Sequence, residues 1–271
     1  MAVSRRGRIA ILGGGVMGET LLTTVLQAGH DPADVVVAEL HAERAEHLRS
    51  THHVEVTDAQ TAVAGARVVL VVVKPQDVTA VLDEVAPLID DGAMVVSLAA
   101  GILIKTYESA LKPGTPVVRV MPNTPALVGE GMFGVSPGQA VSESQLAFVT
   151  SLLATGGEVV VIDESLQDAL TAVSGSGPAY VFYLAEAMEA AGVRAGLDPS
   201  VASRLTIQTL IGAAKLLSES DVDPVELRRR VTSPNGTTAA AIGVFDDRGV
   251  QDALVDGILA AAHRSAELSG S

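Results

Sequence analysis

Short runs of apolar residues alternate with helical patterns through the first half of the chain. Runs this uniformly apolar are typical of strands that are covered on both faces of a sheet. They lie at residues 8–12, 35–38, 68–73, 93–99, 116–121 and 159–162. Helical patterns at residues 16–28 and 41–50 separate the first of them. We therefore expect an α/β domain with a doubly wound, mostly parallel sheet over residues 1–163.

From about residue 163 the strand pattern stops and only helices are predicted. Pro178 is expected to open one helix, and Asp198-Pro199 and Asp223-Pro224 each pair an N-cap residue with a first-turn proline. Two further helices are predicted at residues 237–247 and 250–267. Their apolar faces are too extensive for one small exposed domain, which indicates packing against a second copy of the chain. We expect residues 164–271 to form an all-α dimerisation domain.

Composition narrows the possible functions. The net charge is −14 and aromatic residues make up 3% of the chain, so we expect no nucleic-acid partner. The chain has no cysteine, and its six histidines lack metal-ligand spacing, so we expect no metal site. The longest apolar run is too short to span a bilayer, and no signal-peptide pattern is found. These features predict a cytoplasmic protein with no membrane partner.

The first strand is followed by a glycine-rich turn that opens a helix. The residues Gly13-Gly14-Gly15-Val16-Met17-Gly18 fit the G-x-G-x-x-G pattern of dinucleotide-binding Rossmann domains, in the strand–turn–helix position that the pattern requires. The first glycine permits the tight turn, the second lets the backbone approach a pyrophosphate, and the third lets helix and strand pack closely. We therefore expect these six residues to bind NADH or NADPH.

Other cofactor contacts are expected where neighbouring strands end. Glu39 ends the second strand, where an acid accepts hydrogen bonds from the adenosine ribose of NADH. A carboxylate there repels the 2′-phosphate of NADPH, although His41 and Arg44 could soften that repulsion. The strands at residues 68–73 and 93–99 end in Val73-Lys74-Pro75-Gln76 and Leu98-Ala99-Ala100-Gly101, and both segments are expected to lie where a nicotinamide would bind.

Two junctions in the second half place small residues and hydroxyl groups ahead of a helix. For Ser174-Gly175-Ser176-Gly177-Pro178 the favoured interpretation is ordinary helix capping. Capping does not explain two threonines, Thr237 and Thr238, directly after Gly236. At this second junction we therefore favour a site for a small anion, held by the amides of a helix start.

Segments from both halves of the chain resemble pyrroline-5-carboxylate reductases. The matching segments are ILGGGVMG (11–18), VVKPQ (72–76), LAAGI (98–102), RVMPNTP (119–125), SGSGPAY (174–180), LIGAAKLL (210–217) and VTSPNGTTAAAI (231–242). They follow one another in order, so the resemblance covers essentially the whole chain. SGSGPAY followed by SPNGTT is much more specific than the glycine pattern alone.

The resemblance implies a Rossmann domain followed by a helical domain through which two subunits interlock, with dimers able to assemble into rings. It implies hydride transfer from NADPH or NADH to the imine of 1-pyrroline-5-carboxylate, which gives L-proline in the last step of proline biosynthesis. By position, the resemblance implies that Gly13–Gly18, Val72–Pro75 and Leu98–Ala100 line the cofactor. The residues that would contact the substrate are Glu164, Gly236, Thr237 and Thr238. The substrate carboxylate would lie on the amides around Gly236, and the catalytic Thr238 hydroxyl would hydrogen-bond the ring nitrogen.

Four positions depart from the pattern of the family. Asn235 stands where a glycine is common, which is compatible with a left-handed backbone. Arg230 and Ala59 stand where some relatives carry asparagines that contact the cofactor, and Leu40 where a serine can hold a 2′-phosphate. Together with Glu39, these departures leave the choice between NADPH and NADH open, with NADH favoured.

Two other functions compete with the reductase. A β-hydroxyacid dehydrogenase also joins a Rossmann domain to helices, but it needs a lysine base in the helical half, where Lys215 is the only lysine. A non-catalytic NAD(P)-sensing protein would keep the glycine loop, yet it would have no use for SPNGTT. Oxidation of NADH that depends on added pyrroline-5-carboxylate separates the three.

Overall fold

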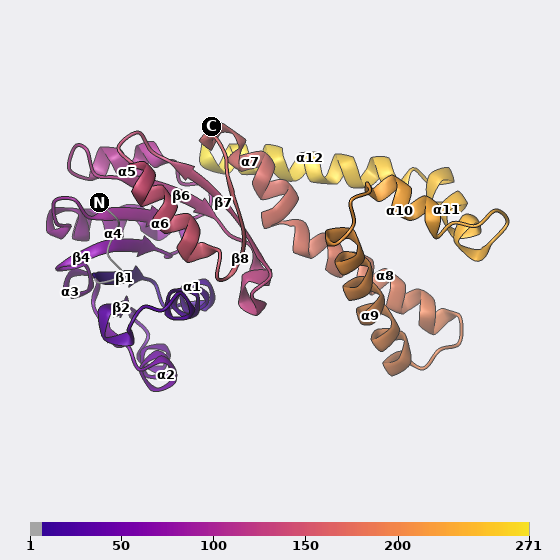
Figure 1. The fold of residues 1–271 in the computed structure, drawn as a ribbon, viewed down its shortest axis with the longest axis horizontal. Helices are drawn as coiled ribbons and strands as arrows, with labels where there is room; N and C mark the ends of the chain where they lie inside the picture. The colour runs from indigo at the N-terminus through magenta and orange to yellow at the C-terminus, as the bar shows by residue number, and fades with distance from the viewer. Residues whose placement is uncertain (1–6, 271) are drawn as a thin grey trace. The chain divides into compact units, whose positions relative to one another are not determined.

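The computed structural model of the protein describes residues 7–270 (Figure 1). The chain divides into two compact units, one formed by Met1–Ser176 with Ala261–Ser271 and the other by Gly177–Ala260. Residues 164–176, which lie in the half that the sequence predicts to be helical, belong to the first unit by their contacts.

The first unit is built on one eight-stranded sheet with strand order β3-β2-β1-β4-β5-β6-β7-β8. The strands are β1 (Arg8–Leu12), β2 (Val35–Ala38), β3 (Glu55–Thr57), β4 (Ala66–Val71), β5 (Met94–Ser97), β6 (Val117–Met121), β7 (Gly131–Pro137) and β8 (Gly157–Val161). Every neighbouring pair is parallel except β6 and β7. The expected doubly wound, mostly parallel sheet is therefore confirmed, with β3 and β7 as strands that the sequence did not predict.

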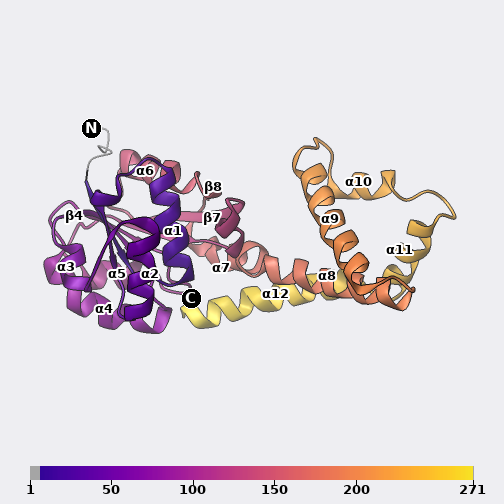
Figure 2. The same cartoon turned by 90° about the horizontal axis from the view of Figure 1, so that it is seen from below.

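Helices cover both faces of this sheet (Figure 2). They are α1 (Val16–Gln27), α2 (Ala42–His52), α3 (Ala59–Val63), α4 (Val78–Val85), α5 (Ile104–Ala110), α6 (Glu143–Leu153) and α7 (Gln167–Leu170). Alternate residues of β1 face opposite sides, so Ile9 and Ile11 join the core under α1, α2 and α6, while Ala10 and Leu12 join the core under α3, α4 and α5. Burial on both faces explains why these strands are apolar throughout.

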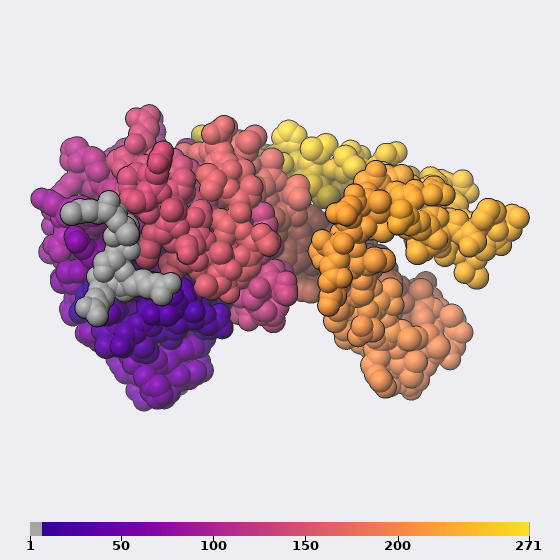
Figure 3. Space-filling model, viewed as in Figure 1, coloured from indigo at the N-terminus to yellow at the C-terminus, as the bar shows by residue number. Residues whose placement is uncertain are grey.

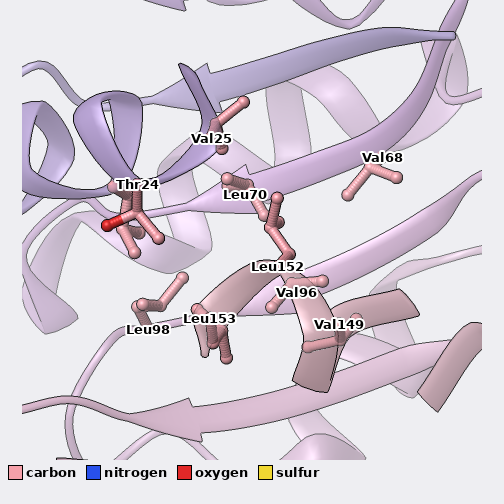
Figure 4. A pocket seen from close by; sticks show the side chains of 10 residues that line it. Thr24, Val25, Val68, Leu70, Val96, Leu98, Val149, Leu152 and Leu153 are labelled. Carbon is pink, nitrogen blue, oxygen red and sulfur yellow. The ribbon is translucent and has the colours of Figure 1, made fainter. Parts of the chain in front are cut away.

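One small gap lies inside the first core, where α1 and α6 meet β4 and β5 (Figure 4). Its volume is about 10 Å³, and its lining is apolar apart from Thr24, whose hydroxyl donates to the Thr20 carbonyl. A space of this size holds at most one water molecule, and an apolar gap stays dry. The gap is therefore a packing feature and not a ligand site.

The second unit consists of helices only. They are α8 (Gly177–Arg194), α9 (Pro199–Ser218), α10 (Pro224–Arg230), α11 (Thr237–Asp247) and most of α12 (Val250–Ser269). Asp198 and Asp223 cap α9 and α10 through their carboxylates, as the Asp-Pro pairs predict. The helices α8 and α9 approach closely at Gly192, where an added Cβ would lie 3.1 Å from the Ala202 Cβ.

This helical unit buries little of its own apolar surface. Within residues 177–260, all of which the structure describes, only Ala202 and Thr206 are buried. Large apolar side chains such as Phe182 and Ile211 are more than half exposed, and Figure 3 shows a hollow between α9 and the α10–α11 segment. Exposed apolar surface on this scale indicates an interaction with another protein surface. Among residues 7–270, no helix has the length and apolarity to cross a membrane.

The segment from Ser174 to Pro178 differs from the sequence prediction. No loop precedes α8, because Thr171–Gly175 form a π-helical turn that continues from α7 almost directly into α8. Neither serine caps a helix, and the Ser174 hydroxyl instead accepts a hydrogen bond from Asn123 Nδ2 at 3.3 Å. The expectation of ordinary capping at this junction is therefore wrong.

Candidate active site

The glycine loop and the segment after β4 are brought together at the carboxyl edge of the sheet. Strand β1 lies between β2 and β4, and the Gly13 amide donates to the Ala38 carbonyl at 3.0 Å. Gly13 has a φ of +106°, and a Cβ there would lie 3.1 Å from the backbone of Val72 and Val73. The strand order reverses direction between β1 and β4, which is where open α/β sheets bind dinucleotides.

Gly15 is the glycine that leaves room for a ligand. It is exposed, and a Cβ added to it would have no atom within 4 Å. It is also the N-cap residue of α1, and no side chain caps that helix. The amides of the first turn are therefore available to an anion, and no side chain fills the space beside Gly15. Gly18, by contrast, is buried, and a Cβ there would overlap the Gly13 carbonyl oxygen.

Glu39 is held tightly beside this loop. Its Oε2 accepts from the Gly14 amide at 3.1 Å, and its Oε1 accepts from the His41 amide at 2.8 Å and contacts His41 Nδ1 at 2.9 Å. Its side chain is 9% exposed. Burial raises the pKa of Glu39, but the hydrogen bonds from His41 and Gly14 outweigh it and lower the pKa overall. A charged carboxylate therefore lies at the end of β2, next to the exposed Leu40.

The other predicted cofactor segments follow the neighbouring strands. The Val72 amide donates to the Leu12 carbonyl and the Leu98 amide to the Val71 carbonyl, each at 2.9 Å. Leu98 and Ala99 are buried, whereas Lys74, Pro75 and Ala100 are exposed. The carboxyl ends of β1, β4 and β5 thus present one continuous edge that carries every predicted cofactor residue except Glu39, which lies beside it on β2.

Glu164 begins a short 3₁₀ turn that follows β8. Its Oε1 accepts from the Ile104 amide at 2.8 Å and from Arg119 Nη1 at 3.2 Å. The Arg119 side chain is 4% exposed, so Glu164 compensates a nearly buried cation. Among the described residues, nothing donates to Glu164 Oε2, and the side chain is 30% exposed. One carboxylate oxygen is therefore structural, and the other is free for a ligand.

A buried hydroxyl pair lies next to Arg119. Ser97 is the β5 partner of Arg119 in the sheet, and its hydroxyl contacts the Tyr107 hydroxyl at 2.6 Å. Burial raises the pKa of Tyr107 to about 12, although the Ser97 hydrogen bond and the Arg119 charge act against it. The tyrosine therefore stays protonated at neutral pH and supports the strand ends without acting as a base.

The predicted anion site lies at the start of α11, in the second unit. Gly236 is the N-cap residue, and no side chain caps the helix. Asn235 has a φ of +61°, the left-handed conformation with which an asparagine in place of the family's glycine is compatible. No described residue makes a side-chain hydrogen bond with the Thr237 or Thr238 hydroxyl, whereas the Thr232 hydroxyl donates to the Arg228 carbonyl. Two hydroxyls and a set of helix-start amides are thus available to a ligand.

Sequence reasoning missed the roles of Arg119 and Asn123. Arg119 is a lone charge within the apolar run at residues 116–121, and this is the signal that could have predicted a buried ion pair. Asn123 accepts from the Met132 amide at 2.8 Å and donates to Ser174, and no pattern in the sequence predicts these partners. Among residues 7–270, no group of three or more histidine and acidic side chains could hold a metal ion.

Comparisons with known proteins identify the family. A family model described as pyrroline-5-carboxylate reductase dimerisation matches residues 164–268, and one described as NADP oxidoreductase, coenzyme F420-dependent, matches residues 8–101. A pyrroline-5-carboxylate reductase of Corynebacterium melassecola is 42% identical over 96% of this chain and 98% of its own length. One of Mycobacterium tuberculosis is 43% identical over 96% of each chain. The chain belongs to the pyrroline-5-carboxylate reductase family.

Solved structures agree with this assignment. A pyrroline-5-carboxylate reductase from Coxiella burnetii superposes with a TM-score of 0.90 at 32% identity, covering 97% of this chain and 98% of the other. The Plasmodium falciparum pyrroline carboxylate reductase with NADP bound gives a TM-score of 0.88 at 25% identity, covering 98% of this chain and 99% of the other. The expected Rossmann and helical fold, the oxidoreductase class and a nicotinamide cofactor are thereby confirmed.

Proposed function

We propose that this protein reduces the C=N bond of 1-pyrroline-5-carboxylate with a reduced nicotinamide cofactor and releases L-proline, the last step of proline biosynthesis. The observation that carries the proposal is the uncapped start of α11, where free amides follow Gly236 and the Thr237 and Thr238 hydroxyls are unengaged among the described residues. A substrate carboxylate suits such a helix start, because the amides and the helix dipole both favour negative charge.

The remaining residues supply binding and orientation. We assign the substrate carboxylate to the amides of Gly236, Thr237 and Thr238, and the ring nitrogen to the Thr238 hydroxyl. Glu164 Oε2, which no described residue engages, is also assigned to the substrate. The reduced nicotinamide supplies the hydride when it is bound. A polar partner at the ring nitrogen favours hydride arrival at the neighbouring carbon, because positive charge on that nitrogen makes the carbon electron-poor.

The cofactor is proposed to lie along the edge formed by the glycine loop, Val72–Pro75 and Leu98–Ala100. Glu39 favours NADH, because its carboxylate is charged and lies where a ribose hydroxyl would donate. NADPH remains a possible cofactor, because His41 contacts the same carboxylate and reduces its repulsion of a 2′-phosphate. Rates with each cofactor decide the preference.

We propose that the helical half assembles two chains into an interlocked dimer, with dimers able to form a larger ring. The exposed apolar surface of the second unit supports this assembly, as does the match of residues 164–268 to a dimerisation family. We take residue 163 as the boundary between the two sequence modules, and a cytoplasmic location stays a prediction. Light scattering coupled to size exclusion measures the mass, and a monomer at micromolar concentration would contradict the proposed assembly.

The test of function is the oxidation of NADH and NADPH with and without 1-pyrroline-5-carboxylate. We expect oxidation only when the imine is present, with proline as the product by mass spectrometry. Cofactor binding without turnover would indicate a sensor, and turnover only with a β-hydroxyacid would indicate the dehydrogenase. The structure does not favour the dehydrogenase, since Lys215, the lysine that it would need as a base, is 71% exposed and pairs with Glu219 at 3.8 Å.

A further inference from the structure

Arg44, in the first turn of α2, reaches across to the glycine loop. Its Nε donates to the Gly14 carbonyl oxygen at 2.6 Å, and its Nη2 donates to the Gly15 carbonyl oxygen at 3.2 Å. The same Nη2 donates to Glu19 Oε2 at 2.5 Å. A guanidinium offers five donors in a planar fork, which lets one side chain hold two successive carbonyls and a carboxylate. A residue from another element therefore holds the backbone orientation of the loop.

The two carbonyl contacts determine where the loop amides point. In a trans peptide the C=O and N–H groups lie on opposite sides. Because the Gly14 carbonyl faces Arg44, the Gly15 amide faces away from it, and the Gly15 carbonyl turns the Val16 amide away in the same manner. These two amides lie at the uncapped start of α1, where Gly15 leaves open space.

Arg44 also compensates a charge that would oppose an anion at this place. Glu19 lies in the first turn of α1, so its carboxylate would repel a pyrophosphate at the helix start. Besides Arg44, His47 Nε2 and His52 Nε2 contact Glu19 Oε1 at 2.9 and 2.7 Å. Burial raises the pKa of Glu19, but the hydrogen bonds from His52, Arg44 and His47 outweigh it and lower the pKa to about 2.

We propose that Arg44 is a positioning residue for the cofactor pyrophosphate. It aims the Gly15 and Val16 amides at the phosphates by holding the carbonyls behind them, and it screens the Glu19 charge. The sequence placed Arg44 only near the 2′-phosphate, whereas in the structure its Nε and Nη2 are engaged at the loop and at Glu19. The inference rests on the proposed function only in taking a dinucleotide as the ligand.

The test compares Arg44→Met with Arg49→Met. Arg49 lies on the same helix, but it donates to the Val56 carbonyl and pairs with Glu46 and has no contact with the loop. Affinity for ADP-ribose, which carries the pyrophosphate and needs no turnover, is measured by calorimetry on the full-length protein. We expect Arg44→Met to weaken ADP-ribose binding by about 10- to 100-fold, as for the loss of charge-assisted hydrogen bonds. The ADP-ribose affinity of Arg49→Met should stay within about twofold of the wild-type affinity, which is a smaller change than the loss of one such hydrogen bond would cause.

Steady-state kinetics distinguish a positioning role of Arg44 from a general loss of folded, active enzyme. Arg44→Met should raise the cofactor KM by about the factor by which it weakens ADP-ribose binding. The kcat at saturating cofactor and the KM for the imine should both stay nearly unchanged. Arg44→Lys should recover part of the affinity, since it keeps the charge but lacks the fork. An unchanged ADP-ribose affinity in Arg44→Met, or in Arg44→Lys if the methionine variant does not fold, overturns the proposal. Absence of imine reduction in the wild type would overturn the proposed function alone, because the ADP-ribose measurement stands without it.

Discussion

Alanine substitutions at Gly15 and Gly18 separate the cofactor role of the glycine loop from its packing role. At Gly15 the new methyl group would have no atom within 4 Å, and the φ of −63° suits any residue. At Gly18 the Cβ would overlap the Gly13 carbonyl oxygen and lie 2.9 Å from the Gly13 carbonyl carbon. We therefore expect Gly15→Ala to impair cofactor binding in a stable protein and Gly18→Ala to destabilise the fold.

The structure sets the size of both effects. Overlap with a backbone atom cannot be relieved by rotating a side chain, so α1 must shift against β1. Overpacking costs typically about 1–3 kcal/mol, and we expect Gly18→Ala near the upper value. That corresponds to a fall in Tm of roughly 6–12 °C for a domain of this size. For Gly15→Ala, the loss of a favourable N-cap glycine is offset by the lower entropy of the unfolded chain, which leaves a net change within about 1 kcal/mol.

Thermal unfolding followed by circular dichroism gives Tm, and the cofactor KM is measured at saturating imine. We expect Gly15→Ala to raise the cofactor KM about 10-fold or more, because the methyl group occupies the space through which the backbone meets a pyrophosphate. An unchanged KM would refute the placement of the pyrophosphate at Gly15. An unchanged Tm in Gly18→Ala would refute the packing argument, since α1 would then have room to move.

Three further predictions concern other parts of the site. Thr238→Ala should lower kcat/KM about 10- to 1000-fold, as for one lost transition-state hydrogen bond. Thr232→Ala is the control and should leave kcat/KM unchanged, because the Thr232 hydroxyl already donates to the Arg228 carbonyl. Equal kcat/KM values for the two variants would remove Thr238 from the mechanism. Glu39→Gln should raise the ratio of kcat/KM for NADPH over NADH by about 3- to 10-fold, and an unchanged ratio would show that this carboxylate does not meet the ribose. The pKa of Glu19, about 2, is depressed from its ordinary value of 4.5, so its contacts stabilise the protein above about pH 4.5 and are lost as pH falls through about 2. The stability difference between wild type and Glu19→Gln, measured by urea unfolding, should shrink over that range, and a constant difference would contradict the assignment.

Much of the fold could be predicted because its strands are covered on both faces. The run at residues 35–38 is uniformly apolar and matches β2 residue for residue, and the glycine pattern directly follows β1. Asp198 and Asp223 correctly predicted two helix starts, because an N-cap carboxylate accepts from first-turn amides and the following proline has its φ fixed near the helical value. Local chemistry alone accounts for these elements.

The elements that were missed depend on partners distant in sequence. Strand β3 has three residues, of which only Val56 is buried, so it gives no apolar run. Strand β7 contains two glycines and ends in Pro137, and it is recognisable as a strand only through its pairing with β6 on one side and β8 on the other. Likewise, Glu164 could be assigned to the substrate by resemblance, but its bonds to Arg119 and the Ile104 amide join segments that no local pattern connects.

In the segment SGSGPAY (174–180), a hydrogen-bond partner distant in sequence allows a structure that the local Ser-Gly-Pro pattern does not predict. Pro178 has no amide hydrogen, so the Ser174 carbonyl four residues earlier has no helical donor. Taken by itself, the proline predicts that a helix starts here. The chain instead stays helical by widening into a π turn, in which the Ser176 amide donates to the Thr171 carbonyl at 2.8 Å. The carbonyl left over at Ser174 accepts from Asn123 Nδ2 at 3.3 Å. RVMPNTP and SGSGPAY therefore form one structural feature, in which the asparagine of the first motif satisfies the carbonyl that the proline of the second leaves without a donor.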